Sequence, residues 1–508
     1  MPWCPDLPSV PARGGWLAAC FAVALGAALS SHAQGLPTEV QAALRRAGVP
    51  EQSMSAVVLD AASGRTLLAW EAEVPRNPAS LAKLLTTTAA LERLGPAWTW
   101  STPVWLAGPV KDGVLEGSLH IKGSGDPRLV LERIWLLLRR VQQLGVREIR
   151  GDILLDQSAF AVPDAPPGEF DGEVLRPYNV RPAALLLNYR SVLYTFVPDA
   201  AAGVARVFVE PALARTTFDR TVPLVGGPCE DWRGALRASF AEARTRFAGS
   251  YAAACGESVW AVADAQPASY DARLLEGLWR EMGGTLGGRV REGAAPADVK
   301  PSFEHRSPPL AEVVRDINKF SNNVMAELLF LTLAAQHGAT PGSAATPDAA
   351  RAWLRRWWTE RLGSPGPLPG LGRQGDPGDE LVIDNGSGLS RDNRISARAL
   401  ARLLQSVYAS PVMPELVSSL PVTGADGTLR RVKVASGRAH LKTGSLRDVA
   451  GIAGYVLAAN GRRHVLVAMV NHPNANAARP ALEALTQWTL NAPGGRDAAA
   501  AARNPQPP

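Results

Sequence analysis

Runs of apolar residues near both ends of the chain predict β-strands. Met54–Asp60 and Thr66–Trp70 are separated by a short segment that contains a glycine, which predicts a hairpin. Towards the end of the chain, three further runs follow one another closely, at 439–445, 449–457 and 464–471. Because consecutive strands joined by tight turns pair with their neighbours, these runs indicate an antiparallel sheet.

Apolar residues with helical spacing surround these strands. The periodic segments are 79–94, 310–320, 324–335, 396–407 and 478–490. The first of them ends at Gly95-Pro96, a pair that commonly closes a helix. Ser321-Asn322-Asn323 separates two of the helices and has the composition of a junction with an N-cap. The pattern therefore favours the α+β fold class.

The middle of the chain, from 101 to 300, shows short strands and turns with a helix at 129–144. Within it, residues 196–256 read as a smaller insert, in which a polar stretch predicts a helix over 232–247. A Gly-Ser-Gly-Asp-Pro turn at 123–127 lacks the spacing of a phosphate-binding loop and is interpreted as structural. At 508 residues the chain is too long for one core, and ~100–200 residues per domain suggests about three domains.

The N-terminus has the pattern of a signal peptide over residues 1–33, with Arg13 ahead of an apolar run from 16 to 29. An alternative is a lipid anchor, since Leu17-Ala18-Ala19-Cys20 is similar to a lipoprotein cleavage box. No later stretch approaches the ~18 consecutive apolar residues of a membrane-spanning helix. We therefore expect an exported protein without a transmembrane span.

Removal of the leader leaves two cysteines, Cys229 and Cys255. An even number of cysteines in an oxidising compartment favours a disulfide. Two free, buried cysteines are the alternative.

The charge of the chain is mildly basic, with a formal net charge of +6. Its arginines are scattered among acidic residues instead of forming runs, so nucleic acid is not expected as a partner. Of the 53 Lys+Arg residues only 7 are lysines. Because an amine can act as a base and a guanidinium cannot, each retained lysine is a candidate for chemistry.

Ser80 and Lys83 form the first candidate for chemistry. Three residues apart at the start of a helix, they share one face, so the amine can reach the hydroxyl. A neutral lysine beside a serine can take its proton and make it a nucleophile. Ser-x-x-Lys alone is common on helix surfaces, so the neighbouring motifs decide its meaning.

Two further motifs follow, Ser321-x-Asn323 and Lys442-Thr443-Gly444. The set Ser-x-x-Lys, Ser-x-Asn and Lys-Thr-Gly, in this order, resembles that of serine β-lactamases and penicillin-binding proteins. Ser80 and Ser321 lie 241 residues apart, which leaves room for one or two inserted domains. This arrangement resembles that of the class C low-molecular-mass penicillin-binding proteins, the D-alanyl-D-alanine carboxypeptidase/endopeptidase family.

The resemblance implies a β-lactamase/transpeptidase-like domain, an antiparallel sheet flanked by helices, built from both ends of the chain and interrupted by β-rich inserted domains. The expected division is a catalytic domain at 34–100 and 301–492, a first inserted domain at 101–195 and 257–300, and a second at 196–256. A disordered tail is expected at 493–508.

The resemblance also implies the roles of the motif residues. Ser80 is expected to form an acyl-enzyme, Lys83 to act as base and Ser321 to pass a proton to the leaving amine. Expected substrate-binding residues are Asn323, Lys442, Thr443, Gly444 and Ser445. Gly444 is expected to let the substrate lie against its strand, and the backbone N–H groups of Ser80 and Ser445 to form the oxyanion hole.

The expected partners are peptidoglycan peptides and β-lactams, in the periplasm, with no cofactor and no metal. Two alternatives stay open. A β-lactamase would share the fold, although the 241-residue gap argues against its compact form. A non-catalytic wall-binding or penicillin-binding protein would not need the intact motifs. The residues do not decide between carboxypeptidase and endopeptidase, and they leave the oligomeric state open.

Overall fold

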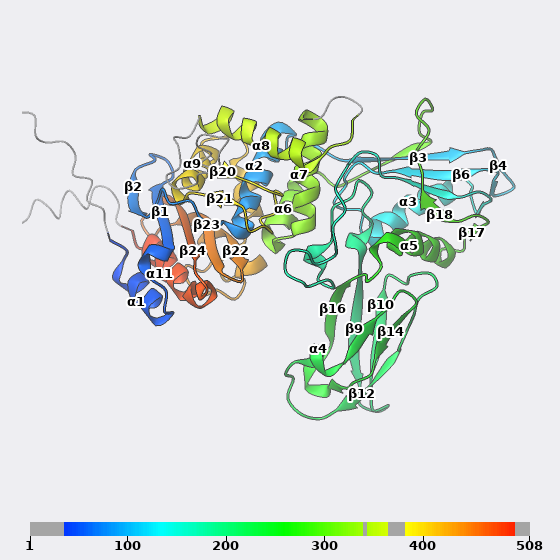
Figure 1. Ribbon diagram of the computed structural model, residues 1–508, viewed down its shortest axis with the longest axis horizontal. Coiled ribbons are helices and arrows are strands. Elements are labelled where there is room, and N and C mark those ends of the chain that lie inside the picture. The colour runs from blue at the N-terminus through cyan, green and yellow to red at the C-terminus, as the bar shows by residue number, and fades with distance from the viewer. Residues whose placement is uncertain (1–34, 339–342, 364–380, 493–508) are drawn as a thin grey trace, which may run out of the picture. The chain divides into compact units, whose positions relative to one another are not determined.

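Both ends of the chain contribute strands to one five-stranded antiparallel sheet (Figure 1). The computed structural model describes residues 35–338, 343–363 and 381–492. The sheet has the order β2-β1-β24-β23-β22, with these bounds: β1 Met54–Asp60, β2 Thr66–Trp70, β22 Ala439–Leu446, β23 Val449–Leu457 and β24 Arg463–Asn471. The antiparallel pairing of β1 with β24, from Met54 opposite Val470 to Asp60 opposite His464, joins the two ends. The predicted sheet built from both ends is confirmed.

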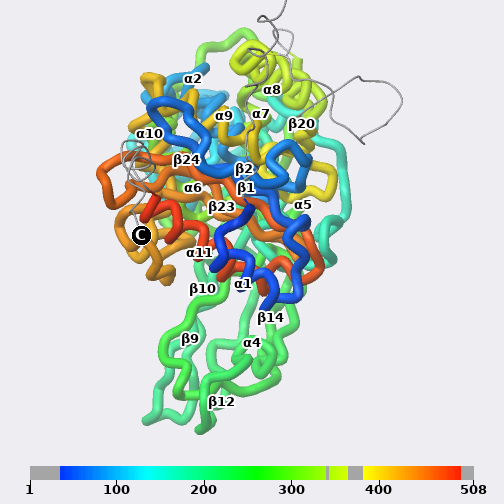
Figure 2. The backbone as a smooth tube through the Cα atoms, turned by 90° about the vertical axis from the view of Figure 1, so that its left-hand side faces the viewer, coloured from blue at the N-terminus to red at the C-terminus, as the bar shows by residue number. Residues whose placement is uncertain are grey.

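Helices cover both faces of this sheet. On one face alternate strand residues, such as Val57, Tyr455 and Val467, share a buried core with a group of helices. These are α2 (Lys83–Arg93), α6 (Leu310–Phe320), α7 (Asn323–His337), α8 (Pro347–Leu362), α9 (Ala397–Tyr408) and α10 (Met413–Ser419). The other face packs against α1 (Thr38–Arg46) and α11 (Arg479–Leu490), which lie together in Figure 2.

A second sheet with its own helices is built from the middle of the chain. Its order is β18-β8-β6-β3-β19, with these bounds: β3 Ser101–Ala107, β6 Ser118–Lys122, β8 Ile153–Asp156, β18 Val290–Glu292 and β19 Phe303–Arg306. Apolar residues of α3 (Leu131–Gln143) and α5 (Pro267–Glu281) share a core with it. This core is separate from the cores of the first sheet.

A third sheet lies within this inserted region. Its order is β15-β12-β10-β9-β16, with these bounds: β9 Ser191–Asp199, β10 Val204–Glu210, β12 Thr221–Val225, β15 Tyr251–Ala252 and β16 Ser258–Ala263. Because β9 begins before residue 196 and pairs with β16, the sheet reaches beyond the expected 196–256 segment. The division into domains stays a prediction.

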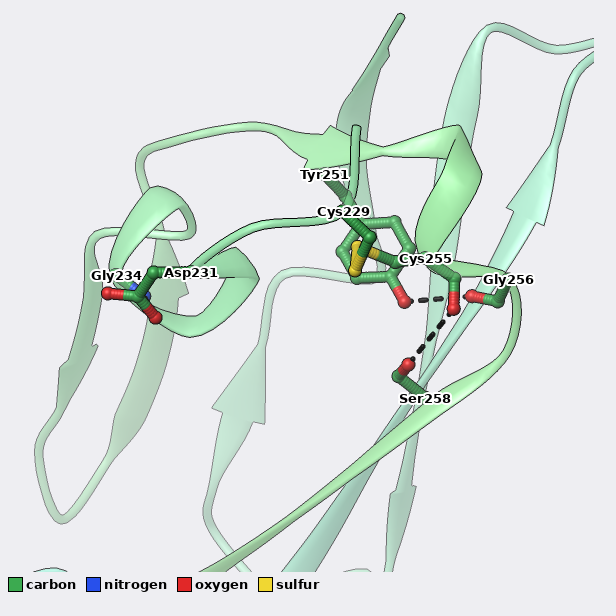
Figure 3. Close-up of a disulfide and its surroundings, with 7 residues drawn as sticks. All are labelled: Cys229, Asp231, Gly234, Tyr251, Cys255, Gly256 and Ser258. Atoms are coloured by element: carbon green, nitrogen blue, oxygen red, sulfur yellow. Dashed lines mark hydrogen bonds between the residues drawn. A yellow bond between two sulfur atoms is a disulfide. The ribbon is translucent and has the colours of Figure 1, made fainter. Parts of the chain in front are cut away.

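The predicted disulfide is present. Cys229 and Cys255 are bonded, with 4.8 Å between their Cα atoms (Figure 3). The bond joins the segment ahead of α4 (Trp232–Ala235) to the segment ahead of β16. Asp231 caps α4 by accepting a hydrogen bond from the backbone N–H of Gly234. The favoured alternative of the sequence analysis is therefore confirmed over two free cysteines.

The predicted helix over 232–247 is wrong. Only the single turn of α4 is helical, and two short strands follow, β13 (Ala238–Phe240) and β14 (Arg244–Phe247). Along β14 the arginines are exposed, while Thr245 and Phe247 are buried. This period-two burial is that of a strand, and Phe247 completes an aromatic cluster with Tyr194 and Phe196.

Several expectations concern residues outside the described ranges. These are the signal peptide at 1–33, the alternative lipid anchor at Cys20 and the disordered tail at 493–508. Within the described ranges, every helix is too short or too polar to cross a bilayer.

Candidate active site

Ser80 lies in a single 3-10 turn, Ala79–Ala82, that continues into α2 at Lys83. The residue before it, Ala79, has a φ of 47°, in the left-handed region that costs a non-glycine residue about 1–2 kcal/mol. Asn77 holds this turn, because its Oδ1 accepts a hydrogen bond from the N–H of Ala79 at 2.8 Å. Its Nδ2 donates to the carbonyl of Ser390 at 2.8 Å. Sequence reasoning missed Asn77, since nothing in its local pattern signals this role.

The Lys83 side chain is fully buried beneath Ser80. Its Nζ donates hydrogen bonds to Ser80 Oγ at 3.0 Å, to Asn323 Oδ1 at 2.7 Å and to the carbonyl of Ser387. Burial lowers the pKa of Lys83 to about 7, and the carboxylate of Glu327 opposes this shift. A substantial share of Lys83 is therefore neutral near pH 7, which is what a base for Ser80 requires.

A second buried amine belongs to Lys442 on β22. Its Nζ donates to Ser321 Oγ at 2.8 Å and to the carbonyl of Thr443 at 2.7 Å. Burial, reinforced by the nearby Lys83, holds the pKa of Lys442 well below its usual value. Ser321 follows the last residue of α6 with a φ of 57°, and this left-handed position carries the chain from α6 into α7.

Glu327 forms the acidic side of the same network. It lies one turn along α7 from Asn323, and its Oε1 accepts a hydrogen bond from Ser387 Oγ at 2.8 Å. Burial raises the pKa of Glu327 to about 7, while the hydrogen bond from Ser387 and the positive charge of Lys83 oppose the rise. Each of the two charges thus opposes the effect of burial on the pKa of the other group.

Neither Glu327 nor Ser387 was predicted as a site residue. Ser387 belongs to the Asn-Gly-Ser-Gly-Leu-Ser stretch, 385–390, which is similar to an accessory motif of the D-alanyl-D-alanine carboxypeptidase/endopeptidase family but was given no role in the site. Glu327 gives no signal beyond its position four residues after Asn323.

Two glycines allow the segments of the site to approach the nucleophile. A Cβ on Gly388 would lie 1.9 Å from the carbonyl oxygen of Ala79, and one on Gly444 would lie 2.7 Å from that of Pro78. Gly444 was expected to make room for the substrate. Its Cβ position faces the Ser80 segment, so the missing side chain lets β22 pack against the nucleophile, and the role towards the substrate stays a prediction.

A cavity of about 340 Å³ opens in front of Ser80. Five of the eight predicted site residues line it: Ser80, Ser321, Thr443, Gly444 and Ser445. The other three lie behind it. Lys83 and Lys442 are hydrogen-bonded to the lining hydroxyls of Ser80 and Ser321, respectively. Asn323 is hydrogen-bonded to Lys83. The three motifs, far apart in the sequence, are thus brought together.

The remaining wall of the cavity is apolar in large part and also carries hydroxyls, the guanidinium of Arg479 and the carboxylate of Glu483. Thr443 Oγ1 and Thr428 Oγ1 are 2.8 Å apart, and Ser445 Oγ contacts Asn476 Oδ1 and Arg479 Nη2 at 3.0 Å each. In the part of the chain that the structure describes, no three His, Cys, Asp or Glu side chains are grouped as metal ligands.

The chain matches a family model described as the D-Ala-D-Ala carboxypeptidase 3 (S13) family over residues 36–492. It is 28% identical to the D-alanyl-D-alanine carboxypeptidase of Actinomadura sp. (strain R39), over 91% of this chain and 85% of that protein. It is 24% identical to D-alanyl-D-alanine carboxypeptidase DacB of Haemophilus influenzae, over 77% of this chain and 80% of that protein.

The fold is similar to that of penicillin binding protein 4 (dacB) from Haemophilus influenzae. The TM-score is 0.67 at 20% identity, and the match covers 88% of this chain and 99% of that one. A serine with a buried lysine, set between helices and an antiparallel sheet of this fold, defines a penicillin-recognising serine hydrolase. The chain belongs to the D-Ala-D-Ala carboxypeptidase 3 (S13) family, and it is a serine DD-peptidase.

Proposed function

We propose that the protein cleaves D-Ala-D-Ala in peptidoglycan stem peptides and the related cross-links, through an acyl-enzyme on Ser80. The observation that carries this proposal is the hydrogen bond of 3.0 Å between Lys83 Nζ and Ser80 Oγ in a buried site. Export by the signal peptide would place the enzyme in the periplasm, where this substrate lies.

Acylation begins when neutral Lys83 takes the proton of Ser80 and Oγ attacks the carbonyl carbon of the penultimate D-alanine. The backbone N–H groups of Ser80 and Ser445 stabilise the oxyanion, and each such donor contributes about 10²–10³ in rate. The C–N bond then breaks, and the departing amine receives a proton through Ser321, which Lys442 orients.

Substrate binding is assigned to Asn323, Lys442 and Thr443. Asn323 holds Lys83 through a 2.7 Å hydrogen bond to its Oδ1, while its Nδ2 donates to the carbonyl of Tyr178 at 3.4 Å. Lys442 and Thr443 form the side that receives the carboxylate end of the substrate. Water then hydrolyses the ester on Ser80 and restores the enzyme. A β-lactam acylates Ser80 by the same attack, and its ester is released slowly.

The test is the intact mass of the mature protein after incubation with benzylpenicillin, followed by a peptide map. We expect one stable adduct on Ser80 and none on Ser80→Ala, whose thermal unfolding should match that of the wild type. Rapid loss of penicillin without an adduct would indicate a β-lactamase instead. Neither adduct nor loss would leave a non-catalytic wall-binding protein.

A second assay addresses the leaving group. Monomeric pentapeptide and a cross-linked dimer are offered separately, and released D-alanine is compared with released monomer. Release of D-alanine defines a carboxypeptidase, and conversion of dimer to monomer defines an endopeptidase.

A further inference from the structure

A groove of about 880 Å³ lies in the inserted region and shares no residue with the active-site cavity. The helices α3 and α5 form one of its walls, and the strands β9 and β10 form the other. Four large apolar side chains in this groove are exposed, with Phe208 55% accessible to solvent: Trp135, Leu136, Leu193 and Phe208. Large apolar side chains that are gathered in one exposed groove indicate a surface for interaction, whereas singly scattered ones do not.

The pairing of the strands continues this apolar surface across the sheet. Phe208 lies opposite Thr195 on β9, and Thr195 lies opposite Val259 on β16. Because directly opposite residues of paired strands point to the same face, Phe208 and Val259 flank Thr195 on the outer face of the sheet. Val259 is also exposed. The face that forms one wall of the groove therefore presents apolar side chains to solvent beyond the groove itself.

Hydrogen bonds hold the two walls of the groove together. Asn188, just ahead of β9, accepts a hydrogen bond on its Oδ1 from the N–H of Leu131 at the start of α3, at 3.1 Å. Tyr270 on α5 donates from its hydroxyl to the carbonyl of Ser191 at 2.7 Å, and this hydroxyl accepts from Asn188 Nδ2 at 3.2 Å. The groove is therefore formed before a partner binds, and binding requires little ordering of the protein.

The charged side chains that line the groove all have the same sign. They are Glu132 on α3, Glu210 on β10 and Glu281 on α5, and each is exposed. Within the described residues, none of the three forms an ion pair. Their charges are therefore available to a ligand.

The exposed cations of the same elements do not neutralise the groove, because they are bound to side chains that do not line it. These contacts are Arg139 with Gln142, Arg140 with Gln143, Arg206 with Asp199 and Arg280 with Glu276. Apolar side chains surrounded by unpaired carboxylates favour a ligand that is apolar and positively charged, since complementary charges select partners and like charges repel them.

The charges also decide among the possible occupants. In a symmetric pair of this chain, the groove would face its own carboxylates. Segments outside the described ranges do not suit it either: 493–508 has no Leu, Ile, Val, Phe or Trp, and 364–380 has three acidic residues against one arginine. The leader at 1–33 is expected to be cleaved. A second protein is the occupant that fits.

We propose that this groove docks an amphipathic helix of a second protein, with an apolar face flanked by Lys or Arg. Since β9 and β10 each have a paired strand on both sides, the partner cannot extend the sheet and must bind through its side chains. Its apolar residues contact Trp135, Leu136 and Phe208, aromatic residues being common among those that dominate binding energy. Its cations pair with the carboxylates. This inference is independent of the reaction at Ser80.

The test uses the mature protein and two fluorescently labelled peptides of about 18 residues, or about five helical turns. One peptide has Leu and Lys in an amphipathic helical pattern, and the other has Leu and Glu in the same pattern. Fluorescence anisotropy measures their binding. We expect the Leu/Lys peptide to bind, and the Leu/Glu peptide to bind at least about tenfold more weakly, because its charges repel those of the groove.

Phe208→Ser tests the apolar part of the groove. Its control is Val299→Ser, at an exposed apolar residue that does not line the groove. We expect the dissociation constant of the Leu/Lys peptide to rise by about tenfold or more in Phe208→Ser, and to change by less than about twofold in the control. Thermal unfolding of both variants should match that of the wild type, because both side chains are exposed.

The double change Glu210→Lys, Glu281→Lys tests the charge. Its control, Glu39→Lys with Glu230→Lys, alters the net charge equally at exposed positions outside the groove. We expect the first variant to lose its preference for the Leu/Lys peptide and to favour the Leu/Glu peptide, and the control to behave as the wild type.

Four results would overturn the proposal. Equal binding of the two peptides to the wild type, or unchanged binding in Phe208→Ser, would show that the groove does not receive such a helix. A wild type that sediments as a dimer and is converted to a monomer by Phe208→Ser would assign the groove to a second copy of this chain. Binding of an N-acetylglucosamine oligosaccharide that Phe208→Ser abolishes would assign it to a glycan strand.

Discussion

Two five-stranded sheets of this protein are stabilised in different ways. The sheet β2-β1-β24-β23-β22 has helices on both faces, and β1 is buried along its whole length. The inserted sheet β15-β12-β10-β9-β16 has an exposed face, as the alternating burial along β10 shows, and a disulfide joins segments beside it. The buried amines of Lys83 and Lys442 belong to the first sheet and to a helix packed on it, and this burial is what lowers their pKa.

We therefore expect the reactivity of Ser80 to depend on the sheet β2-β1-β24-β23-β22, which has helices on both faces, and to be independent of the disulfide Cys229–Cys255. Four changes test it, in order of decreasing effect on the reactivity of Ser80.

Lys83→Arg keeps the positive charge but removes the base, since a guanidinium does not deprotonate in proteins. We expect the rate of acylation by benzylpenicillin to fall by about 10²–10⁴-fold, the usual contribution of general base catalysis. Stopped-flow or quenched mass measurements give this rate. Lys433→Arg, on an exposed lysine, serves as control and should react normally. Near-normal acylation of Lys83→Arg would exclude Lys83 as the base.

Gly388→Ala introduces a Cβ where the carbonyl oxygen of Ala79 lies 1.9 Å away, at a φ of +86°. We expect the Ser80 segment to shift, acylation to slow, and the free energy of unfolding to fall by about 1–3 kcal/mol from overpacking, in addition to the conformational cost. Denaturant unfolding and penicillin labelling measure the two effects.

Gly461→Ala is the matched control for this change. Gly461 has a similar φ of +82°, but a Cβ there meets nothing within 4 Å. In Gly461→Ala the free energy of unfolding should fall only by the conformational cost of the positive φ, and penicillin labelling of Ser80 should be normal. Equal behaviour of the two variants would show that the close approach to Ala79 does not position the nucleophile.

Glu327→Gln removes the negative charge that raises the pKa of Lys83. Because neutral Lys83 is the active form, the wild-type rate should rise with pH through about 7. Without the carboxylate the pKa of Lys83 falls further, so this rise should move to lower pH. The measurement is kcat/KM for acylation between pH 5 and 9, compared with Glu39→Gln, an exposed glutamate on α1. An unchanged pH dependence of kcat/KM in Glu327→Gln would show that Glu327 does not influence the pKa of Lys83.

The double substitution Cys229→Ser, Cys255→Ser tests the other side of the comparison. The residues are 26 apart in sequence, and loop-closure entropy assigns about 3–4 kcal/mol to such a link. We expect faster proteolysis within the insert and unchanged penicillin labelling of Ser80. Loss of labelling would mean that the insert supports the site.

Sequence reasoning predicted long, strongly apolar elements well. The strands Met54–Asp60, Thr66–Trp70 and Val449–Leu457 and the helix Leu310–Phe320 have the predicted bounds. It failed at 232–247, where short strands with exposed arginines have the polarity of a surface helix. Period-two burial over three or four residues is too short a pattern to separate the two.

At the site, the motifs identified Lys83, which contacts Ser80, but not the residues that support this pair. Lys83 and Asn323 meet across 240 residues, and Ser387 reaches Lys83 through its backbone carbonyl, which any residue possesses. Asn77 holds the Ser80 turn through contacts with Asn471 and Ser390, which arise only when β24 and the segment ahead of α9 lie next to that turn. Such roles follow from tertiary packing, and local patterns carry no trace of them.

The pairing of Met54 with Val470 also fixes when activity can begin. During synthesis β1 emerges early, but its neighbour β24 is the last strand to be made, so the sheet stays open until almost the whole chain is available. Asn471, which holds Asn77 beside the nucleophile, arrives with β24. Domains dominated by such distant pairings fold late and slowly. A partly synthesised or truncated chain therefore contains the serine but not its activated form, and the hydrolase is silent until its last strand has docked.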